Sequence, residues 1–181
     1  SRIAAARDPQ HARMPPMNEV HAVARGHPPR IHGLVLDALV LDVKVGRGAF
    51  MKTRRDAREL ARSIVRVGKL AKKKVVAVLT AMDAPLGYAV GNALETREAI
   101  DVLNGGGPPD LIEITLALGA EMLVLGGVAK NVATARTKLA ASLRDGSGAR
   151  AFERIIEAQG GDPAVVRDPS RLPAAHEKRL I

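Results

Sequence analysis

Two short apolar runs on either side of an amphipathic stretch constrain the fold of this chain more than any other feature. Residues 36–43 (LDALVLDV) and residues 75–81 (VVAVLTA) have the length and composition of buried strands. Between them, Thr53 can cap a helix whose small and aliphatic residues share one face. A strand–helix–strand order predicts a βαβ unit with two parallel strands and a right-handed crossover.

The chain after the second strand is predicted to be helical. Helices are expected from a cap at Asn92 to about Leu103, from the proline pair at 108–109, from residue 132 to a stop at Gly146, and around residues 152–156. The expected buried face of the proline-initiated helix comprises Leu111, Ile114, Leu118, Met122 and Leu125. We therefore assign the chain to the α/β class, as a partial parallel sheet flanked by helices.

Composition divides the chain into three segments. Residues 1–33 contain several prolines and keep neither a helical nor a strand period, so we expect an irregular leader. Residues 34–161 make up the predicted α/β domain, and residues 162–181, with three prolines, are expected to be a linker toward a further domain. Four histidines of the leader have spacings that match no common metal-ligand pattern; these are His11, His21, His27 and His32.

The overall composition narrows the classes of function. No apolar run reaches the ~18 residues of a membrane span, and the absence of cysteine fits a reducing compartment, so we expect a soluble cytoplasmic protein without a membrane partner. The net charge of +9 could suit nucleic acid. However, the basic residues are interspersed with acids, and only 2% of residues are aromatic and able to stack on bases. We therefore expect no nucleic-acid partner.

The residues alone reveal no catalytic set. The chain has no Ser–His–Asp arrangement, no cysteine nucleophile and no Walker loop. Glu95 and Glu98 lie three residues apart on a predicted helix, which suits either a paired site or a solvated face. His176, in the C-terminal tail, is expected to be a surface residue.

The loops that follow the two strands are better candidates for a ligand site. In open parallel sheets, ligands bind beyond the carboxyl ends of the strands, so KVGRGAF and MDAPLGYAVGN are expected to meet at one edge. Phe50 is the aromatic residue of the first loop. Its ring either forms one side of a site for a planar ligand or packs against the core as a plug that holds the loop in place.

Two long blocks in these regions resemble the pyrimidine-nucleoside phosphorylase and thymidine phosphorylase family. They are LDALVLDVKVGRGAFMKT, residues 36–53, and DAPLGYAVGNALETREAIDVLNGGGPPDL, residues 83–111. The resemblance runs from about Leu36 to Gly160 and implies the large α/β domain of a nucleoside phosphorylase, of the glycosyltransferase family 3 type. It also implies phosphorolysis, in which orthophosphate cleaves a pyrimidine nucleoside or deoxynucleoside to the base and the pentose 1-phosphate. Full-length members of that family are homodimers.

The resemblance assigns roles to four residues. Phe50 stands where the family's base pocket has a phenylalanine. The family also binds a potassium ion, and its ligands match the backbone carbonyls of Leu86 and Ala89 and the carboxylate of Glu98. Carbonyl and carboxylate oxygens suit a hard monovalent cation.

Other residues that the resemblance implies are missing. The family's phosphate-binding Lys–Ser segment and its base-contacting Arg have no counterpart. Its base-binding Ser and Lys would fall on Gly26 and Arg30, in a stretch whose prolines break the required helix. We therefore assign no catalytic residue to this chain and expect the chain alone to be inactive. The simplest hypothesis is a fragment whose leader comes from a frame error or a degraded gene.

Two alternatives stay open at this point. One is a non-catalytic remnant or binding module with the same fold. The other is a related phosphoribosyltransferase or a basic nucleic-acid-binding protein. Preference for thymidine or uridine depends on residues outside this sequence.

Overall fold

The computed structural model describes residues 37–175. These residues belong to one compact unit. The predicted leader with its four histidines, the positions Gly26 and Arg30, and His176 lie outside the described residues.

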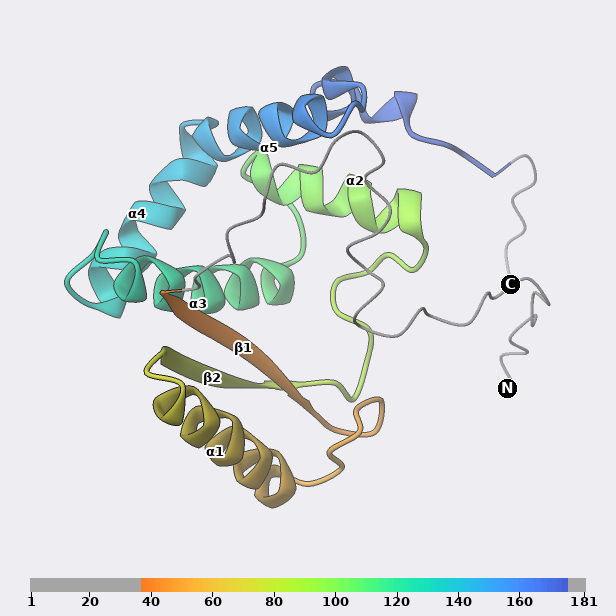
Figure 1. The fold of residues 1–181 in the computed structure, drawn as a ribbon. Coiled ribbons are helices and arrows are strands. Elements are labelled where there is room, and N and C mark those ends of the chain that lie inside the picture. Colours follow the sequence, from red (N-terminus) through yellow and green to blue (C-terminus); the bar gives the residue numbers. More distant parts are fainter. Residues whose placement is uncertain (1–36, 176–181) are drawn as a thin grey trace, which may run out of the picture. The chain divides into compact units, whose positions relative to one another are not determined.

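Two parallel strands and one crossover helix begin the described part. β1 (Ala38–Val45) pairs with β2 (Lys74–Ala81), and α1 (Arg54–Leu70) connects them (Figure 1). The prediction of a parallel βαβ unit is confirmed, and the fold class is α/β. β1 lies two residues further along the chain than predicted, because its pairing with β2 continues to Val45, opposite Ala81.

The helical prediction for the rest of the chain is confirmed as well. The helices are α2 (Asn92–Leu103), α3 (Pro109–Leu125), α4 (Val132–Arg144) and α5 (Ser147–Ala158). Two short 3-10 helices follow, η2 (Pro163–Val166) and η3 (Pro169–Arg171). Within residues 37–175, no helix is long and apolar enough to cross a membrane.

Side chains at the helix starts show why the chain turns helical where it does. Thr53 accepts a hydrogen bond from the Asp56 amide and caps α1, as expected. The prediction that Asn92 caps α2 is wrong, because Gly91 is the cap and Asn92 is the first helical residue. The Glu95 carboxylate accepts from the Gly91 amide at 2.9 Å, so a carboxylate one turn later satisfies this amide instead.

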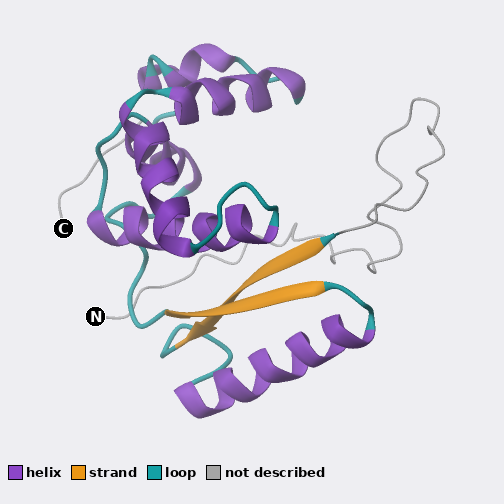
Figure 2. Cartoon of the chain, turned by 90° about the vertical axis from the view of Figure 1, so that its left-hand side faces the viewer, coloured by secondary structure: helices purple, strands orange, loops and turns teal. Residues whose placement is uncertain are grey.

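The sheet is packed between two helices (Figure 2). Val43 of β1 is buried against Ala57 and Ala61 of α1, and side chains from both strands and the following loop complete this core; these are Val45, Met51, Ala77 and Leu79. α3 contacts the strands from the opposite side. Small residues on α1 allow the helix to approach the sheet closely, which explains why Ala57 is fully buried.

The helical part has two further cores. Ala120 of α3 packs with Ala129 and Ala135, so the close approach of α3 and α4 depends on small side chains. This packing turns Met122 outward with 62% of its surface exposed, and the prediction that Met122 is buried is wrong. The second core joins Ile100, Ala149 and Val166.

Residues beyond 161 take part in this second core. Val166 of η2 is 2% exposed, and Asn104 donates a hydrogen bond to its carbonyl. Arg97 of α2 donates to the carbonyl of Pro169. The segment expected to be a linker therefore begins with packed structure.

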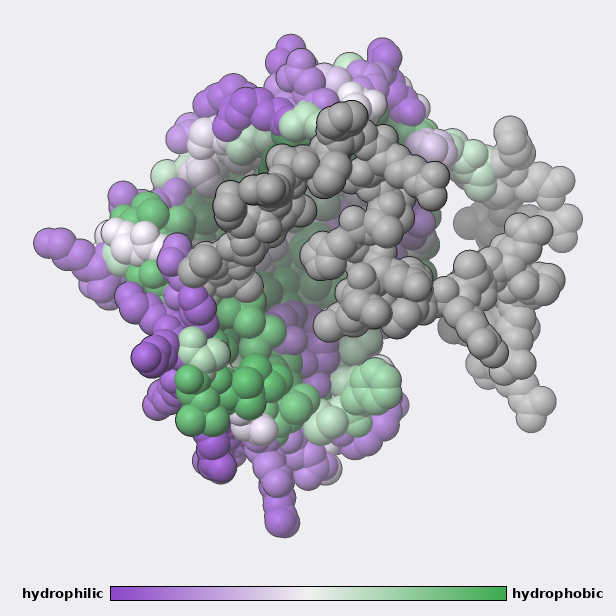
Figure 3. Space-filling model, in the orientation of Figure 1, coloured by the Kyte–Doolittle hydropathy of each residue, from purple (hydrophilic) through white to green (hydrophobic). Residues whose placement is uncertain are grey.

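Among residues 37–175, no further strand pairs with either outer edge of the two-stranded sheet, and a single bridge joins Val45 at the end of β1 to Met51. Figure 3 shows apolar surface gathered in the area where Figure 1 places β1 and α1. The exposed aliphatic residues of these two elements are Leu39, Leu60, Val67 and Leu70. One flank of α1 is thus apolar and open.

Ile100 offers a test of the second core. We expect Ile100→Ala to lower the free energy of unfolding by about 2–5 kcal/mol, because the side chain is fully buried and its removal leaves a cavity. Ile155→Ala on α5 is the matched control, since Ile155 is 51% exposed and the same change is expected to cost about 1 kcal/mol or less. Urea unfolding of both variants measures the difference. Equal losses would contradict the assignment of Ile100 to the core.

Candidate functional site

The loops that follow β1 and β2 are joined at the carboxyl edge of the sheet. The Met82 amide donates to the carbonyl of Val45, and the Gly48 amide donates to the carbonyl of Met82, both at 2.8 Å. The two loops therefore meet as the parallel arrangement predicts. Their mutual position is set by backbone hydrogen bonds.

Asp83 adds a side-chain bond between the same loops. Its Oδ1 atom accepts a hydrogen bond from the Arg47 amide at 2.9 Å. Gly46 packs directly against this carboxylate: its φ is +136°, and a Cβ at that position would lie 2.7 Å from Asp83 Oδ1. Gly46 is therefore required both by its backbone conformation and by the close approach of Asp83.

Phe50 is presented at the tip of the first loop. Its side chain is 98% exposed, whereas the neighbouring Ala49 is 6% exposed and turns inward. Ala49 anchors the loop, and the interpretation of Phe50 as a plug is wrong. The ring stands free at the edge where a ligand is expected.

Two carboxylates from different helices organise the second loop. Glu98 of α2 accepts hydrogen bonds from the amides of Tyr88 and Ala89 through the same oxygen, at 2.8 and 3.1 Å. Asp110 of α3 accepts from the Gly87 amide at 3.0 Å. Three consecutive backbone amides thus point at carboxylate oxygens, and this fixes the loop conformation.

Gly87 lies too close to Glu98 for any larger residue. A Cβ on Gly87 would lie 2.0 Å from Glu98 Oε2, and the φ of Gly87 is +71°. Glycine at this position lets the loop wrap around the carboxylate. The structure therefore brings Glu98 into contact with the loop that contains Leu86 and Ala89.

The donor set around Glu98 fits a hard cation in chemical type. Within residues 37–175, Glu98 Oε1 is engaged by two amides and Oε2 accepts no hydrogen bond. No group of three or more His, Cys, Asp or Glu side chains occurs in the described part of the chain. A cation at this position would therefore depend on backbone oxygens together with one carboxylate.

A pocket of about 460 Å³ lies between the end of β2, the second loop and α3. Its lining is mainly apolar, with the carboxylates of Asp83, Asp110 and Glu113 among the polar groups. A hydrogen bond from the Arg136 guanidinium holds the pKa of Glu113 below its usual value, so Glu113 remains a carboxylate near neutral pH. Phe50 does not line this pocket.

A polar cluster lies at the carboxyl ends of the strands, on β1 and β2. Asp42 accepts a hydrogen bond from the Thr80 hydroxyl and forms an ion pair with Lys44, whose Nζ is 2.6 Å from Asp42 Oδ2. The strand register sets Lys44 opposite Thr80, and side chains two residues apart on one strand share a face. This cluster ties the two strands together just before the ligand edge.

Three of the site carboxylates had no role in the sequence-based predictions: Asp42, Asp83 and Asp110. Each bonds across elements that are distant in the sequence. Asp83 could have been found, since it is the first charged residue after β2 at the edge where ligands bind. Asp110, in contrast, lies in the first turn of α3, where acidic residues are common, so its position in the sequence does not mark it as a site residue.

The close approach of the two loops can be tested at Gly48. A Cβ on Gly48 would lie 2.8 Å from the backbone oxygen of Met82, so we expect Gly48→Ala to lower the free energy of unfolding by about 1–3 kcal/mol. Gly106→Ala is the matched control, because its nearest atom, the Asp101 carbonyl oxygen, is 3.5 Å away. That change is expected to stay within about 0.5 kcal/mol. Identical urea midpoints for the two variants would show that the loops do not meet in this way.

Comparison with known proteins supports the resemblance. The family described as "Glycosyl transferase family, a/b domain" matches residues 31–149. The pyrimidine-nucleoside phosphorylase of Bacillus subtilis (strain 168) is 50% identical over 139 residues, which are 77% of this chain and 32% of that protein. The enzymes of the same name from Geobacillus stearothermophilus and Staphylococcus aureus (strain USA300) are 49% and 48% identical over the same shares. The chain spans about a third of the length of these curated relatives.

Proposed function

The chain belongs to the glycosyl transferase family through its α/β domain, and on this basis we propose that it is part of a pyrimidine-nucleoside phosphorylase. The proposed reaction is the phosphate-dependent cleavage of a pyrimidine nucleoside or deoxynucleoside to the base and the pentose 1-phosphate. The observation that carries the proposal is the 50% identity over 77% of this chain to an enzyme of that name. The two joined loops at the carboxyl edge of the sheet lie at the position where such a fold binds ligands.

Phe50 is the proposed contact to the base. Its ring is free, and the loop beneath it is held by the Asp83 carboxylate and by the buried Ala49. An aromatic face offers a planar base a stacking surface without requiring a particular hydrogen-bond pattern. The base therefore meets a ring on a loop whose backbone is held in place before binding.

We propose that the second loop holds the potassium ion, through the carbonyls of Leu86 and Ala89 and the carboxylate of Glu98. When bound, the ion supplies positive charge close to the phosphate-binding part of the enzyme. The backbone amides of Tyr88 and Ala89 donate hydrogen bonds to Glu98, and these keep the carboxylate beside this loop. The residues of this chain thus orient the ion, and the phosphate-binding residues of the family have no counterpart here.

Three further parts of the proposal rest on the resemblance. Orthophosphate is the second substrate, the active enzyme is a homodimer, and the reaction takes place in the cytoplasm. The absence of cysteine from the sequence is in keeping with a reducing compartment.

A chimeric enzyme tests the proposed function. Residues 36–160 of this chain replace the matching segment of the B. subtilis enzyme, and release of pyrimidine base from uridine or thymidine is measured with and without phosphate. We expect release that depends on phosphate. A folded chimera that binds pyrimidine base but releases none would favour the non-catalytic alternative instead.

The role of Phe50 is tested in the same chimera. We expect Phe50→Ala to raise KM for the nucleoside by roughly fivefold, since an aromatic contact of this kind contributes about 1 kcal/mol. Phe50→Tyr keeps the ring and is expected to keep KM near the parent value. If both variants behave like the parent, Phe50 does not contact the base.

The chain alone is expected to release no base from either nucleoside, because the family's phosphate-binding and base-binding residues have no counterpart in it. The assay uses the purified 181-residue chain and detects thymine or uracil by chromatography. Release that depends on phosphate would overturn this expectation.

The ion site is tested by thermal unfolding of the chain in potassium and in sodium at equal ionic strength. We expect Tm to be higher in potassium by about 2–4 °C, because an ion that binds only the folded state stabilises it. Glu98→Ala is expected to remove the difference. Glu95→Ala is the control, since Glu95 bonds to Gly91 and not to the 87–89 segment, and it is expected to keep the difference. Equal Tm values in both salts for the parent chain would exclude the ion site.

A further inference from the structure

The Asp110 side chain is held in place by its own helix. Asp110 is the second residue of α3, which begins at Pro109, and its Oδ1 atom accepts a hydrogen bond from the Leu111 amide at 2.9 Å. Amides in the first turn of a helix have no partner within the helix, so this carboxylate satisfies one of them. The conformation of the Asp110 side chain is therefore set by the start of α3.

α3 is itself anchored away from the second loop. Ala120 of α3 packs in the core with Ala129 and Ala135, and the helix contacts both strands of the sheet. One turn after Asp110, Glu113 forms an ion pair with Arg136 of α4. A carboxylate at the start of this helix therefore has a position that does not depend on the loop.

The other oxygen of Asp110 reaches the second loop. Its Oδ2 atom accepts a hydrogen bond from the Gly87 amide at 3.0 Å, between residues that are 23 positions apart in the sequence. Glu98 of α2 contacts the same glycine, since a Cβ on Gly87 would collide with its carboxylate. Two carboxylates from different helices thus contact one residue of the loop.

The bond to Gly87 sets the direction of the carbonyl that precedes it. The peptide between Leu86 and Gly87 is trans and planar, so its N–H and its C=O point in opposite directions. Because the N–H points at Asp110, the Leu86 carbonyl points away from that carboxylate. The Leu86 carbonyl is one of the proposed ligands of the potassium ion.

We propose that Asp110 is a positioning residue of the potassium site, which holds the Leu86 carbonyl in its ligating direction through the Gly87 amide. The proposal rests on the ion site proposed above. A ligand that is oriented before the ion arrives loses less conformational freedom on binding, so the ion binds more tightly. Asp110 acts on the ion through the backbone and does not need to touch it.

Two other roles of Asp110 are separable from this one. As a direct ligand it would act through its charge, whereas both of its oxygens accept hydrogen bonds from amides. As a first-turn acid it would stabilise α3 through the helix dipole. A dipole effect changes Tm equally in potassium and in sodium, whereas a positioning effect changes the affinity for potassium.

Stepwise replacement of sodium by potassium at constant ionic strength, with Tm of the full chain as the readout, tests the proposal. Tm rises once the potassium concentration exceeds Kd, so the onset of the rise reports Kd and is not moved by a general loss of stability. We expect Asp110→Ala to raise the onset concentration roughly fivefold, as for the loss of one hydrogen bond.

Two further variants separate the hydrogen bond from the charge. Asp110→Asn keeps an oxygen that can accept from the Gly87 amide, and we expect its onset to stay within about twofold of the parent. Glu113→Ala is the matched control, because it removes the same charge from the same helix one turn later and Glu113 is paired with Arg136. We expect it to leave the onset unchanged.

Amide hydrogen exchange, measured by NMR, tests the bond itself. We expect the Gly87 amide to exchange faster in Asp110→Ala than in the parent by roughly fivefold, because the amide loses its acceptor. In Asp110→Asn, exchange of this amide is expected to stay close to the parent rate.

Unchanged exchange of the Gly87 amide or an unchanged onset in Asp110→Ala would overturn the proposal. So would an equal shift of the onset in Glu113→Ala, or Asp110→Asn behaving like Asp110→Ala, since the charge would then matter and not the hydrogen bond. A parent chain whose Tm does not respond to potassium would remove the ion site and this proposal with it. Base release by the chimera tests the proposed enzyme function separately from all of these outcomes.

Discussion

The parallel pairing of β1 with β2 is the interaction on which the other features of this structure depend. Because Val45 lies opposite Ala81, the chain leaves both strands at the same edge, and the two following loops begin side by side. The backbone bonds between Val45, Met82 and Gly48 extend this pairing into the loops. A shift of one residue in the register would turn the core face of each strand away from α1 and separate the groups that meet at the edge.

In the candidate site, carboxylates hold the backbone of the two loops in place by accepting hydrogen bonds from their amides. Asp83 bonds to the Arg47 amide, Asp110 bonds to the Gly87 amide, and Glu98 bonds to two amides of the second loop. Glycines stand where the chain passes closest to these oxygens, which explains the glycine-rich character of both loops. The arrangement leaves an exposed aromatic ring and a cation-compatible carboxylate as the groups available to ligands.

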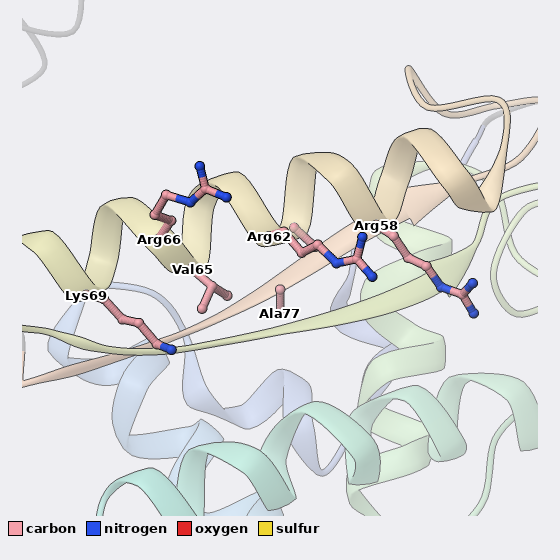
Figure 4. A pocket seen from close by; sticks show the side chains of 7 residues that line it. Arg58, Arg62, Val65, Arg66, Lys69 and Ala77 are labelled. Atoms are coloured by element: carbon pink, nitrogen blue, oxygen red, sulfur yellow. The ribbon is translucent and has the colours of Figure 1, made fainter.

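The same βαβ unit presents two different flanks of α1. One flank is apolar and exposes Leu60, Val67 and Leu70, and the other carries exposed cations beside β2, at Arg58, Arg62, Arg66 and Lys69 (Figure 4). Apolar side chains favour contact with other apolar groups, whereas exposed cations favour water or anionic groups. The two flanks of α1 therefore differ in chemistry, and the carboxyl edge of the sheet lies at the end of the strands between them.

Local pattern was enough to predict the two strands and the five α-helices of the described residues, but not the 3-10 helices after residue 161. The apolar runs, the Thr53 cap and the paired prolines identified the strands and helices, because each signal acts within a few residues. By resemblance, the two motif blocks also predicted that Phe50 and Glu98 are site residues. Only the tertiary structure decided the contacts across long sequence separations: the outward turn of Met122, the free ring of Phe50, and the bonds of Asp83 and Asp110 to distant amides. The sequence does not indicate which amide a carboxylate will accept a hydrogen bond from, because that partner is set by the packing that brings two distant segments together.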